Sequence, residues 1–311
     1  MFLAAAAPQA THAANHLSFF QAIVIGVFQG ITELFPVSSL GHTVLIPKLF
    51  GWNNLVKSQA ASESFYLAFI VGLHVANAVA LMVFFWKDWV RIVKAFFVTL
   101  RTRRVETSTE RLAWLIVVAS IPTGILGVLL EHKVRTLLAK PMSAAIFLMI
   151  NGVILIAGER VRRRSVVREL AAREGTTPEG SRRLDTLEYR EAGIIGVIQT
   201  LALIAGISRD GVTMVAGLVR GLDNEDAAKF AFLLATPIIF AAGIYKLHDL
   251  FGVNGDGVRG QVLAGSVVTF FVSLLSVRFL VQYFKTRNLV PFGLYCLGFG
   301  AFMTVFVAAG A

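Results

Sequence analysis

Long apolar runs alternate with short polar segments along most of this chain. Six runs are long enough to cross a hydrocarbon layer about 30 Å thick, which takes roughly 20 apolar residues in a helix. They lie at residues 65–86, 112–130, 141–158, 228–247, 260–282 and 289–309. The pattern predicts an all-α integral membrane protein with six transmembrane helices.

Two further apolar stretches are too short to span, because polar residues interrupt them. Residues 17–32 end at Glu33, and residues 192–207 end just before Arg209. Each is followed by a turn of small residues and a second short apolar stretch, at 40–50 and 212–222. A half-length helix, a polar turn and a half-length return predict a re-entrant hairpin. Such a hairpin is tolerated only where protein or a water-filled cavity covers its broken backbone.

Composition and charge narrow the class of protein. Hydrophobic residues make up 56% of the chain, charged residues 15%, and the mean hydropathy is +0.71, which excludes a soluble globule and a disordered chain. Of 29 Lys and Arg, seven lie in 87–111 and nine in 159–190. Such clustering is typical of cytoplasmic loops and not of a nucleic-acid groove. We therefore expect no nucleic-acid partner, and both termini outside the cytoplasm.

Two smaller observations exclude other features. The single cysteine, Cys296, excludes an intramolecular disulfide and a cysteine-based zinc site. The first 17 residues contain no Lys or Arg, so they lack the positive region that opens a signal peptide.

An internal repeat relates the two interrupted stretches at an offset of 170 residues. Eight of the 23 positions from 22 to 44 are identical in the second copy. These are Ala22, Ile25, Gly26, Val27, Gln29, Ser38, Gly41 and Thr43, which recur as Ala192, Ile195, Gly196, Val197, Gln199, Ser208, Gly211 and Thr213. Three spans follow each copy, and because three is odd, the second copy enters the membrane from the opposite face. In such an inverted-topology repeat, the site lies where the broken elements meet near mid-membrane.

The repeat also predicts how the chain is organised. We expect one membrane domain over residues 1–311. Within it, the first repeat covers 18–158 with its hairpin at 18–50, the cytoplasmic basic loop covers 159–190, and the second repeat covers 191–309 with its hairpin at 191–222.

The first turn carries residues suited to chemistry. Gln29 and Glu33 are four apart and lie on one helix face. An intramembrane carboxylate is costly, so Glu33 is a functional candidate. Pro36 is expected to end the first half-helix and Ser38 to cap the second.

A candidate nucleophile, Ser39, comes directly after Ser38 in the sequence. Ser39 and His42 are three apart and are expected to share one face, and a hydroxyl beside an imidazole is typical of an activated nucleophile. His74 and Asn77, in the first span, are expected to serve in packing or in polar contacts between helices.

The second turn contains Ser208, a cap, and Arg209, which opens the next half-helix. Two helix N-termini converging from opposite faces make an anion site, and the guanidinium fork suits phosphate. Thr213, with Gln199, is expected to form interhelical hydrogen bonds. Asp210 adjoins Arg209 in sequence but is expected to point about 100° away around the helix.

These residues resemble a known family. The first turn is similar to the (Glu/Gln)-x-x-x-Glu and Pro-Val-Ser-Ser-x-Gly-His signature of the undecaprenyl-diphosphate phosphatases, also called bacitracin-resistance proteins. The second turn resembles that family's Pro-Gly-x-Ser-Arg-Ser-x-x-Thr motif. Weaker similarities at Ile121-Pro122 with Gly127, at 232–237 and at 291–295 extend the likeness over most of residues 18–309.

The resemblance implies an enzyme of the bacterial inner membrane. It would hydrolyse undecaprenyl diphosphate to undecaprenyl phosphate and phosphate, recycling the lipid carrier of cell-wall synthesis and giving bacitracin resistance. The family's fold also has six spans, two re-entrant hairpins and inverted repeats. A divalent cation, Mg²⁺ or Ca²⁺, is implied. Carried over by motif, the catalytic residues are Glu33, Ser39, His42 and Arg209, and the phosphate-binding residues are Gln29, Ser38, Ser208, Arg209 and Thr213.

Four positions depart from the family pattern. Gln29 stands where Glu is common, Ala205 replaces a Pro, Asp210 replaces a Ser, and Cys296 stands where an Arg is common. Asp210 either stabilises the helix N-terminus or joins Glu33 and Gln29 as an oxygen ligand of the cation.

The sequence is compatible with more than one nucleophile and with a second function. The nucleophile is Ser39 or a water, with His42 as general base, or His42 itself as a phosphoenzyme. A lipid flippase or ion-coupled transporter, in which Glu33 and Arg209 couple ion movement, is the rival function. The oligomeric state, including a homodimer, is likewise open.

Overall fold

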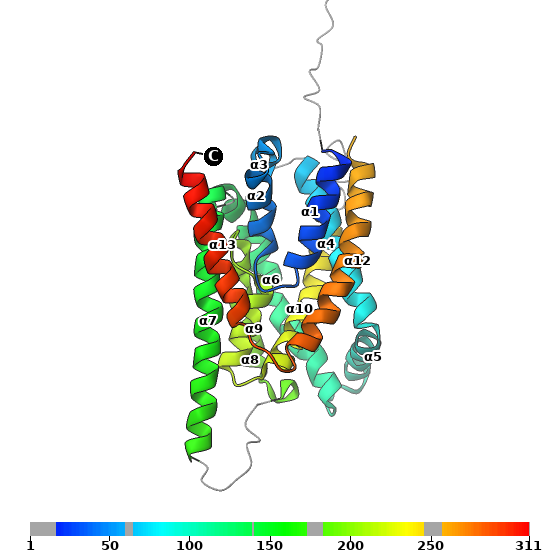
Figure 1. The fold of residues 1–311 in the computed structure, drawn as a ribbon. Coiled ribbons are helices and arrows are strands. Elements are labelled where there is room, and N and C mark those ends of the chain that lie inside the picture. The colour runs from blue at the N-terminus through cyan, green and yellow to red at the C-terminus, as the bar shows by residue number, and fades with distance from the viewer. Residues whose placement is uncertain (1–16, 60–64, 139, 173–182, 246–256, 311) are drawn as a thin grey trace, which may run out of the picture.

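A computed structural model describes residues 17–59, 65–138, 140–172, 183–245 and 257–310 of the chain. Nearly all of the first 17 residues lie outside these ranges, as do residues 173–182 of the basic segment 159–190 and the last two residues of the predicted span 228–247. Within the described ranges, every regular element is a helix (Figure 1).

The long helices are α4 (Phe65–Phe84), α6 (Ser108–Leu138), α7 (Pro141–Ala172), α10 (Asn224–Tyr245), α12 (Arg259–Tyr283) and α13 (Val290–Ala308). The shorter α-helices are α1 (Phe19–Thr32), α2 (Ser39–Leu49), α3 (Asn53–Gln59), α5 (Trp86–Thr102), α8 (Tyr189–Gln199) and α9 (Arg209–Val219). Two 3₁₀ turns, η1 (Leu184–Thr186) and η2 (Thr200–Leu203), precede and follow α8.

The six predicted spans are confirmed as helices. Among the described residues, six helices are long and apolar enough to cross a membrane, at 65–84, 108–130, 141–163, 224–245, 259–283 and 290–308. The third continues as α7 to Ala172, well past the predicted end at residue 158. The apolar run ends there, but the Arg, Glu and Val residues that follow are compatible with a helix that leaves the membrane.

The outer surface of the bundle is apolar. On α12, Leu263, Val267, Phe271 and Leu275 are spaced four apart and are all exposed. Residues at this spacing form one stripe along a helix. An exposed stripe of this kind is unfavourable in water but suits contact with lipid, so the protein is a multi-pass membrane protein.

The first predicted hairpin is formed by α1 and α2, which occupy one half of the bundle and meet at a turn near its middle (Figure 1). Ser18 starts α1 with a capping box, accepting from the Gln21 backbone N–H while the Gln21 side chain accepts from Ser18. The helix ends at Thr32, before Pro36 is reached. Hydrogen bonds of turn type, such as the one from Val37 N–H to Phe35 O, already replace the helix there.

The second hairpin lies in the opposite half of the bundle, where α8, η2 and α9 lead to and from a turn (Figure 1). The helical part of its first arm is shorter than the apolar stretch 192–207, because α8 ends at Gln199 and a 3₁₀ turn follows. Gly206 then adopts a φ of 109°, a conformation that glycine reaches readily.

Small residues let the hairpins pack closely on the long helices. A Cβ on Gly26 of α1 would lie 2.7 Å from the carbonyl oxygen of Gly265 on α12, and the Thr269 hydroxyl donates to Gly26 O over 2.9 Å. A Cβ on Gly196 of α8 would lie 2.1 Å from Ala119 O on α6. Close helix approach at small residues is typical of membrane helices. It fixes both hairpins firmly, so that their turns hold defined positions.

Candidate active site

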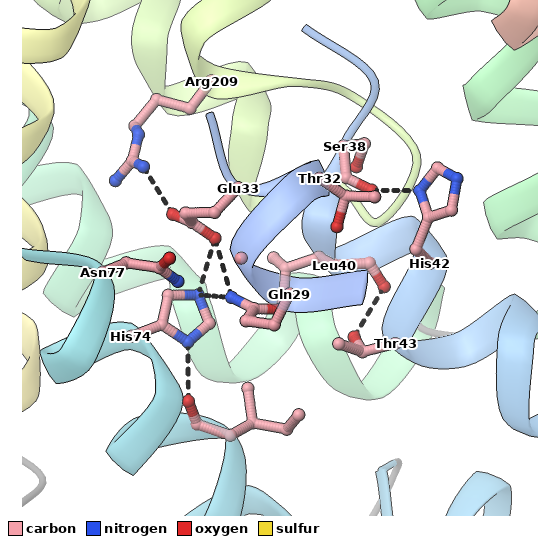
Figure 2. A network of polar contacts seen from close by, with 12 residues as sticks. Gln29, Thr32, Glu33, Ser38, Leu40, His42, Thr43, His74, Asn77 and Arg209 are labelled. Atoms are coloured by element: carbon pink, nitrogen blue, oxygen red, sulfur yellow. Dashed lines mark hydrogen bonds and ion pairs between the residues drawn. The ribbon is translucent and has the colours of Figure 1, made fainter. Parts of the chain in front are cut away.

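Glu33 is the centre of a buried polar cluster (Figure 2). It follows the last residue of α1, and its backbone N–H still donates to Gln29 O. One carboxylate oxygen accepts from the Arg209 guanidinium at 2.5 Å. The other accepts from the Gln29 side chain at 2.9 Å and lies 3.3 Å from His74 Nε2. The cluster therefore joins α1, α4 and the start of α9.

The pair of Glu33 and Arg209 joins residues 176 positions apart, one from each predicted hairpin. Only 3% of the Glu33 side chain is exposed, against 17% of the Arg209 side chain. A carboxylate buried to this extent is strongly unfavourable unless paired and hydrogen-bonded, and Arg209, Gln29 and His74 supply those partners. Because Arg209 keeps part of its surface exposed, it can also reach an anion that approaches the cluster.

Ser39 lies at the first position of α2 and is partly exposed. Its hydroxyl is close enough to interact with the Glu33 carboxylate. The structure thus brings together the predicted residues Gln29, Glu33, Ser39 and Arg209. A hydroxyl, a carboxylate and a guanidinium within one cluster can bind a phosphoryl group and deprotonate a nucleophile.

His42 is directed away from this cluster (Figure 2). Its Nδ1 lies 2.7 Å from Ser38 O, and its Nε2 lies 2.8 Å from the Tyr295 hydroxyl. Because a carbonyl oxygen only accepts, Nδ1 carries the proton and Nε2 accepts from Tyr295. Among the described residues, no hydrogen bond joins His42 to Ser39. Both residues lie in the first turn of α2 at the predicted spacing of three, but the His42 ring bonds Ser38 and Tyr295 and not the Ser39 hydroxyl.

The two capping serines are placed as predicted. Ser38 Oγ accepts from Gly41 N–H at 3.2 Å, and Ser208 Oγ accepts from Gly211 N–H at 3.1 Å. Both side chains are buried. Ser38 has a φ of 69°, which is strained for a residue with a Cβ and marks the tightness of the first turn.

Thr213 and Asp210 occupy buried positions on α9. Thr213 donates to the Gln199 side chain at 3.3 Å, which agrees with the predicted interhelical hydrogen bond. Asp210 Oδ1 lies 3.5 Å from Arg209 Nε, so the length of the arginine side chain overcomes the expected angular separation. Asp210 Oδ2 is buried and has no hydrogen-bond partner among the described residues.

Three residues of the site were not singled out by the sequence. His74 was expected to serve in packing or in polar contacts between helices, with no role in the site, and it contacts Glu33 and Gln29. An ionisable residue within an apolar span was the available signal. Tyr295 holds the His42 ring, and Asn151 of α7 bonds both turns. No local spacing predicted either contact, because their partners are remote in sequence.

The donors present fit a divalent cation only in part. Within the described residues, no group of three or more His, Cys, Asp or Glu side chains converges as a metal site. However, Gln29 Oε1 and Asp210 Oδ2 are buried without partners, and Glu33 lies in the same cluster. Mg²⁺ is commonly held by one or two carboxylates together with substrate phosphates. Oxygen donors are therefore present, but a cation would need a phosphate-containing ligand to complete its coordination.

Together, the fold and the cluster define a class: a multi-pass helical membrane protein with a buried acid–guanidinium pair where two short hairpins meet. The chain belongs to the family of the bacitracin resistance protein BacA, because the model of that family matches residues 22–302.

Curated relatives are similar over nearly the whole chain. Undecaprenyl-diphosphatase 2 of Frankia alni is 55% identical, with 94% of this chain and 98% of the relative covered. The undecaprenyl-diphosphatase of Mycolicibacterium paratuberculosis is 56% identical over the same shares of each chain. Undecaprenyl-diphosphatase 1 of Burkholderia pseudomallei is 40% identical, with 92% of this chain and 96% of the relative covered.

Proposed function

We propose that this protein hydrolyses undecaprenyl diphosphate to undecaprenyl phosphate and inorganic phosphate, which recycles the lipid carrier of cell-wall synthesis and confers bacitracin resistance. The observation that carries the proposal is the buried cluster of Glu33, Arg209 and Ser39 at the meeting point of the two hairpins. Membership of the BacA family and the names of the relatives support it. Release of phosphate by the purified protein in detergent tests it directly.

The diphosphate binds first, with its lipid tail against the apolar surface of the bundle. Arg209 supplies a guanidinium fork that matches two phosphate oxygens. The N-termini of α2 and α9 add unpaired backbone N–H groups and the positive ends of two helix dipoles. In binding the diphosphate, Arg209 exchanges the Glu33 carboxylate for phosphate oxygens, and Glu33 is released to act as a base.

Ser39 then attacks the terminal phosphorus atom. Its proton passes to Glu33, the new Oγ–phosphorus bond forms, and the bond from phosphorus to the bridging oxygen breaks. Undecaprenyl phosphate departs with that oxygen, and water later hydrolyses the phosphoserine to release phosphate. Glu33 is favoured over His42 as the proton acceptor because both ring nitrogens of His42 already have partners. In this proposal His42 holds the first turn of α2 against α13.

A divalent cation, Mg²⁺ or Ca²⁺, is part of the proposal, with Gln29, Asp210 and one carboxylate oxygen of Glu33 as its protein ligands, which leaves the other Glu33 oxygen to accept the Ser39 proton. When bound, it supplies positive charge that neutralises the diphosphate. The unpartnered oxygens of Gln29 and Asp210 support this assignment.

Asp210 is expected to matter for the cation requirement. Asp210→Ser should raise the cation concentration that gives half-maximal activity about tenfold, because loss of a group that supports a metal site costs this much or more in affinity. Adding Gln29→Glu should largely restore it by returning a carboxylate to the site. Titration of activity with Mg²⁺ and Ca²⁺ measures the shift. The same cation dependence in wild type and both variants would assign Asp210 to stabilising the N-terminus of α9 instead.

We further propose that the two hairpins are re-entrant and that residues 18–158 and 191–309 form inverted-topology repeats. The positions of α1–α2 and α8–α9 in opposite halves of the bundle support this arrangement (Figure 1). The basic segments 87–111 and 159–190 then face the cytoplasm of the inner membrane, and both termini face away from it. Both halves of the site come from one chain, so the proposed reaction needs no homodimer.

The orientation makes a prediction about accessibility. In a Cys296→Ser background, Gly310→Cys should react with a membrane-impermeant maleimide added outside intact spheroplasts. Arg104→Cys, on an exposed residue of the first basic segment, should react only after the membrane is permeabilised. Both positions lie on the surface of the protein, so the membrane decides their labelling. Cytoplasmic labelling of position 310 would refute the inverted-repeat orientation.

A further inference from the structure

The two turns contact each other through residues that are equivalent in the repeat. A Cβ on Gly41 would lie 3.1 Å from Gly206 N, and a Cβ on Gly211 would lie 3.3 Å from Pro36 Cβ. At the offset of 170, Gly41 corresponds to Gly211 and Pro36 to Gly206. Gly41 therefore packs against Gly206, and its repeat equivalent Gly211 packs against Pro36, which is the repeat equivalent of Gly206.

The hydrogen bonds between the two turns, unlike these packing contacts, are not the same in the two directions. Ser38 Oγ accepts from Gly206 N–H across the contact at 3.1 Å, in addition to its own cap bond from Gly41. The equivalent bond in the other direction would run from the backbone nitrogen of Pro36 to Ser208 Oγ. Proline has no N–H and cannot donate it. The contact between Pro36 and Ser208 therefore lacks the direct hydrogen bond that Gly206 makes to Ser38.

Asn151 supplies hydrogen bonds on that side. It lies on α7 and is completely buried. Its Nδ2 donates to Pro36 O at 3.0 Å, and its Oδ1 accepts from Ser208 N–H at 3.0 Å. Nδ2 also contacts Cys296 Sγ on α13 at 3.4 Å, which gives the second amide hydrogen a partner. One side chain thus connects the two turns.

We propose that Asn151 is a positioning residue that replaces the hydrogen bond Pro36 cannot make and so holds Arg209 in place over Glu33. Arg209 is the neighbour of Ser208, and Glu33 lies in the turn that leads to Pro36. Fixing the separation of Ser208 and Pro36 therefore fixes the pair on which diphosphate binding depends. The catalytic part of this inference rests on the proposed function. Its structural part concerns only the two turns.

The amide is the group that this position requires. It offers a donor and an acceptor at once, whereas a carboxylate only accepts and an aliphatic side chain does neither. With Asn151→Leu, which has a similar volume, Ser208 N–H loses its partner while it stays buried, and Pro36 O keeps only the long contact from Cys296 Sγ at 4.0 Å. A buried group without a partner is strongly unfavourable. The buried groups can regain hydrogen bonds only if the two turns move, and Arg209 then moves with the second turn.

The test compares Asn151→Leu with Thr123→Val, each purified in detergent. Thr123 of α6 is also buried and donates across helices to Gly196 O at 2.8 Å, ten residues before Gly206 of the second turn. Hydrogen exchange followed by mass spectrometry should be faster in the peptides covering 34–42 and 204–212 for Asn151→Leu only. The kcat for phosphate release should fall about 100-fold, the effect of misplacing reacting groups by roughly 1 Å, with a smaller change in KM.

The outcomes separate the two proposals. Wild-type exchange at both turns together with wild-type kcat in Asn151→Leu would overturn the positioning role. If wild type itself released no phosphate, the proposed function would fail, while faster exchange at the turns would still support the connection through Asn151. If Asn151→Leu does not fold, Asn151→Ala is expected to give the same exchange pattern, and unchanged exchange in it would count equally against the proposal.

Discussion

Arg209→Lys is expected to reduce kcat on the order of 1,000-fold, the smaller end of what removal of an arginine costs in phosphoryl transfer. Lysine keeps the positive charge beside Glu33, so the buried carboxylate stays paired and the fold is preserved. It loses the planar fork that holds two phosphate oxygens at once. The effect should therefore fall on turnover, measured as phosphate release from undecaprenyl diphosphate, and not on thermal stability.

Arg220→Lys is the matched control. Arg220 caps the other end of α9 and also pairs with a glutamate, Glu191, at 3.7 Å. Its substitution should leave kcat within a factor of two or so, because lysine keeps the charge and the pair lies at the opposite end of α9 from the Glu33 cluster. Near-normal turnover in Arg209→Lys would mean that a point charge suffices and that the fork has no role in catalysis.

Ser39→Ala is expected to reduce turnover at least ~1,000-fold, as deletion of a nucleophile does in other hydrolases. The hydroxyl is the group of the cluster that can form a bond to phosphorus, and the Glu33 carboxylate, with which it interacts, is the proposed acceptor of its proton. Ser39 is only partly buried, so its loss should change the melting temperature little. Phosphate release under single-turnover conditions measures the chemical step itself.

Ser120→Ala controls for the loss of a serine hydroxyl. Ser120 lies on α6 and donates to the backbone of its own helix, at Ile116 O. It should keep wild-type turnover. If Ser39→Ala also kept wild-type turnover, the attacking group would be a water molecule, and Glu33 would deprotonate that water in place of the Ser39 hydroxyl.

Much of the fold could be predicted from the sequence because hydrophobicity decides which segments span a membrane. The six spans agree with the apolar runs to within a few residues, but α6 continues to Leu138 and α7 to Ala172, well past the ends of their runs. Apolarity shows where a helix leaves the membrane, but not where it ends. The end of α1 at Thr32 agrees with the predicted stretch 17–32, but it lies four residues before Pro36, the residue expected to end the helix.

The site was predictable where its contacts are local and unpredictable where they are not. The caps Ser38 and Ser208 depend on neighbouring residues, and they form as the sequence indicates. Ser39 and His42 have helical spacing, yet His42 turns to Tyr295, 253 positions away. His74 likewise contacts Glu33 from another helix, α4. Such contacts depend on how helices pack, which residue spacing does not encode.

The central claim is that the buried cluster cleaves a lipid diphosphate. The most direct measurement is release of inorganic phosphate from undecaprenyl diphosphate by the purified wild-type protein in detergent, with Glu33→Gln as the inactive control. The account predicts one phosphate and one undecaprenyl phosphate for each substrate consumed, and a rate near background for Glu33→Gln. Wild-type protein that released no phosphate, but moved the lipid between the leaflets of a vesicle, would contradict the account and identify a transporter.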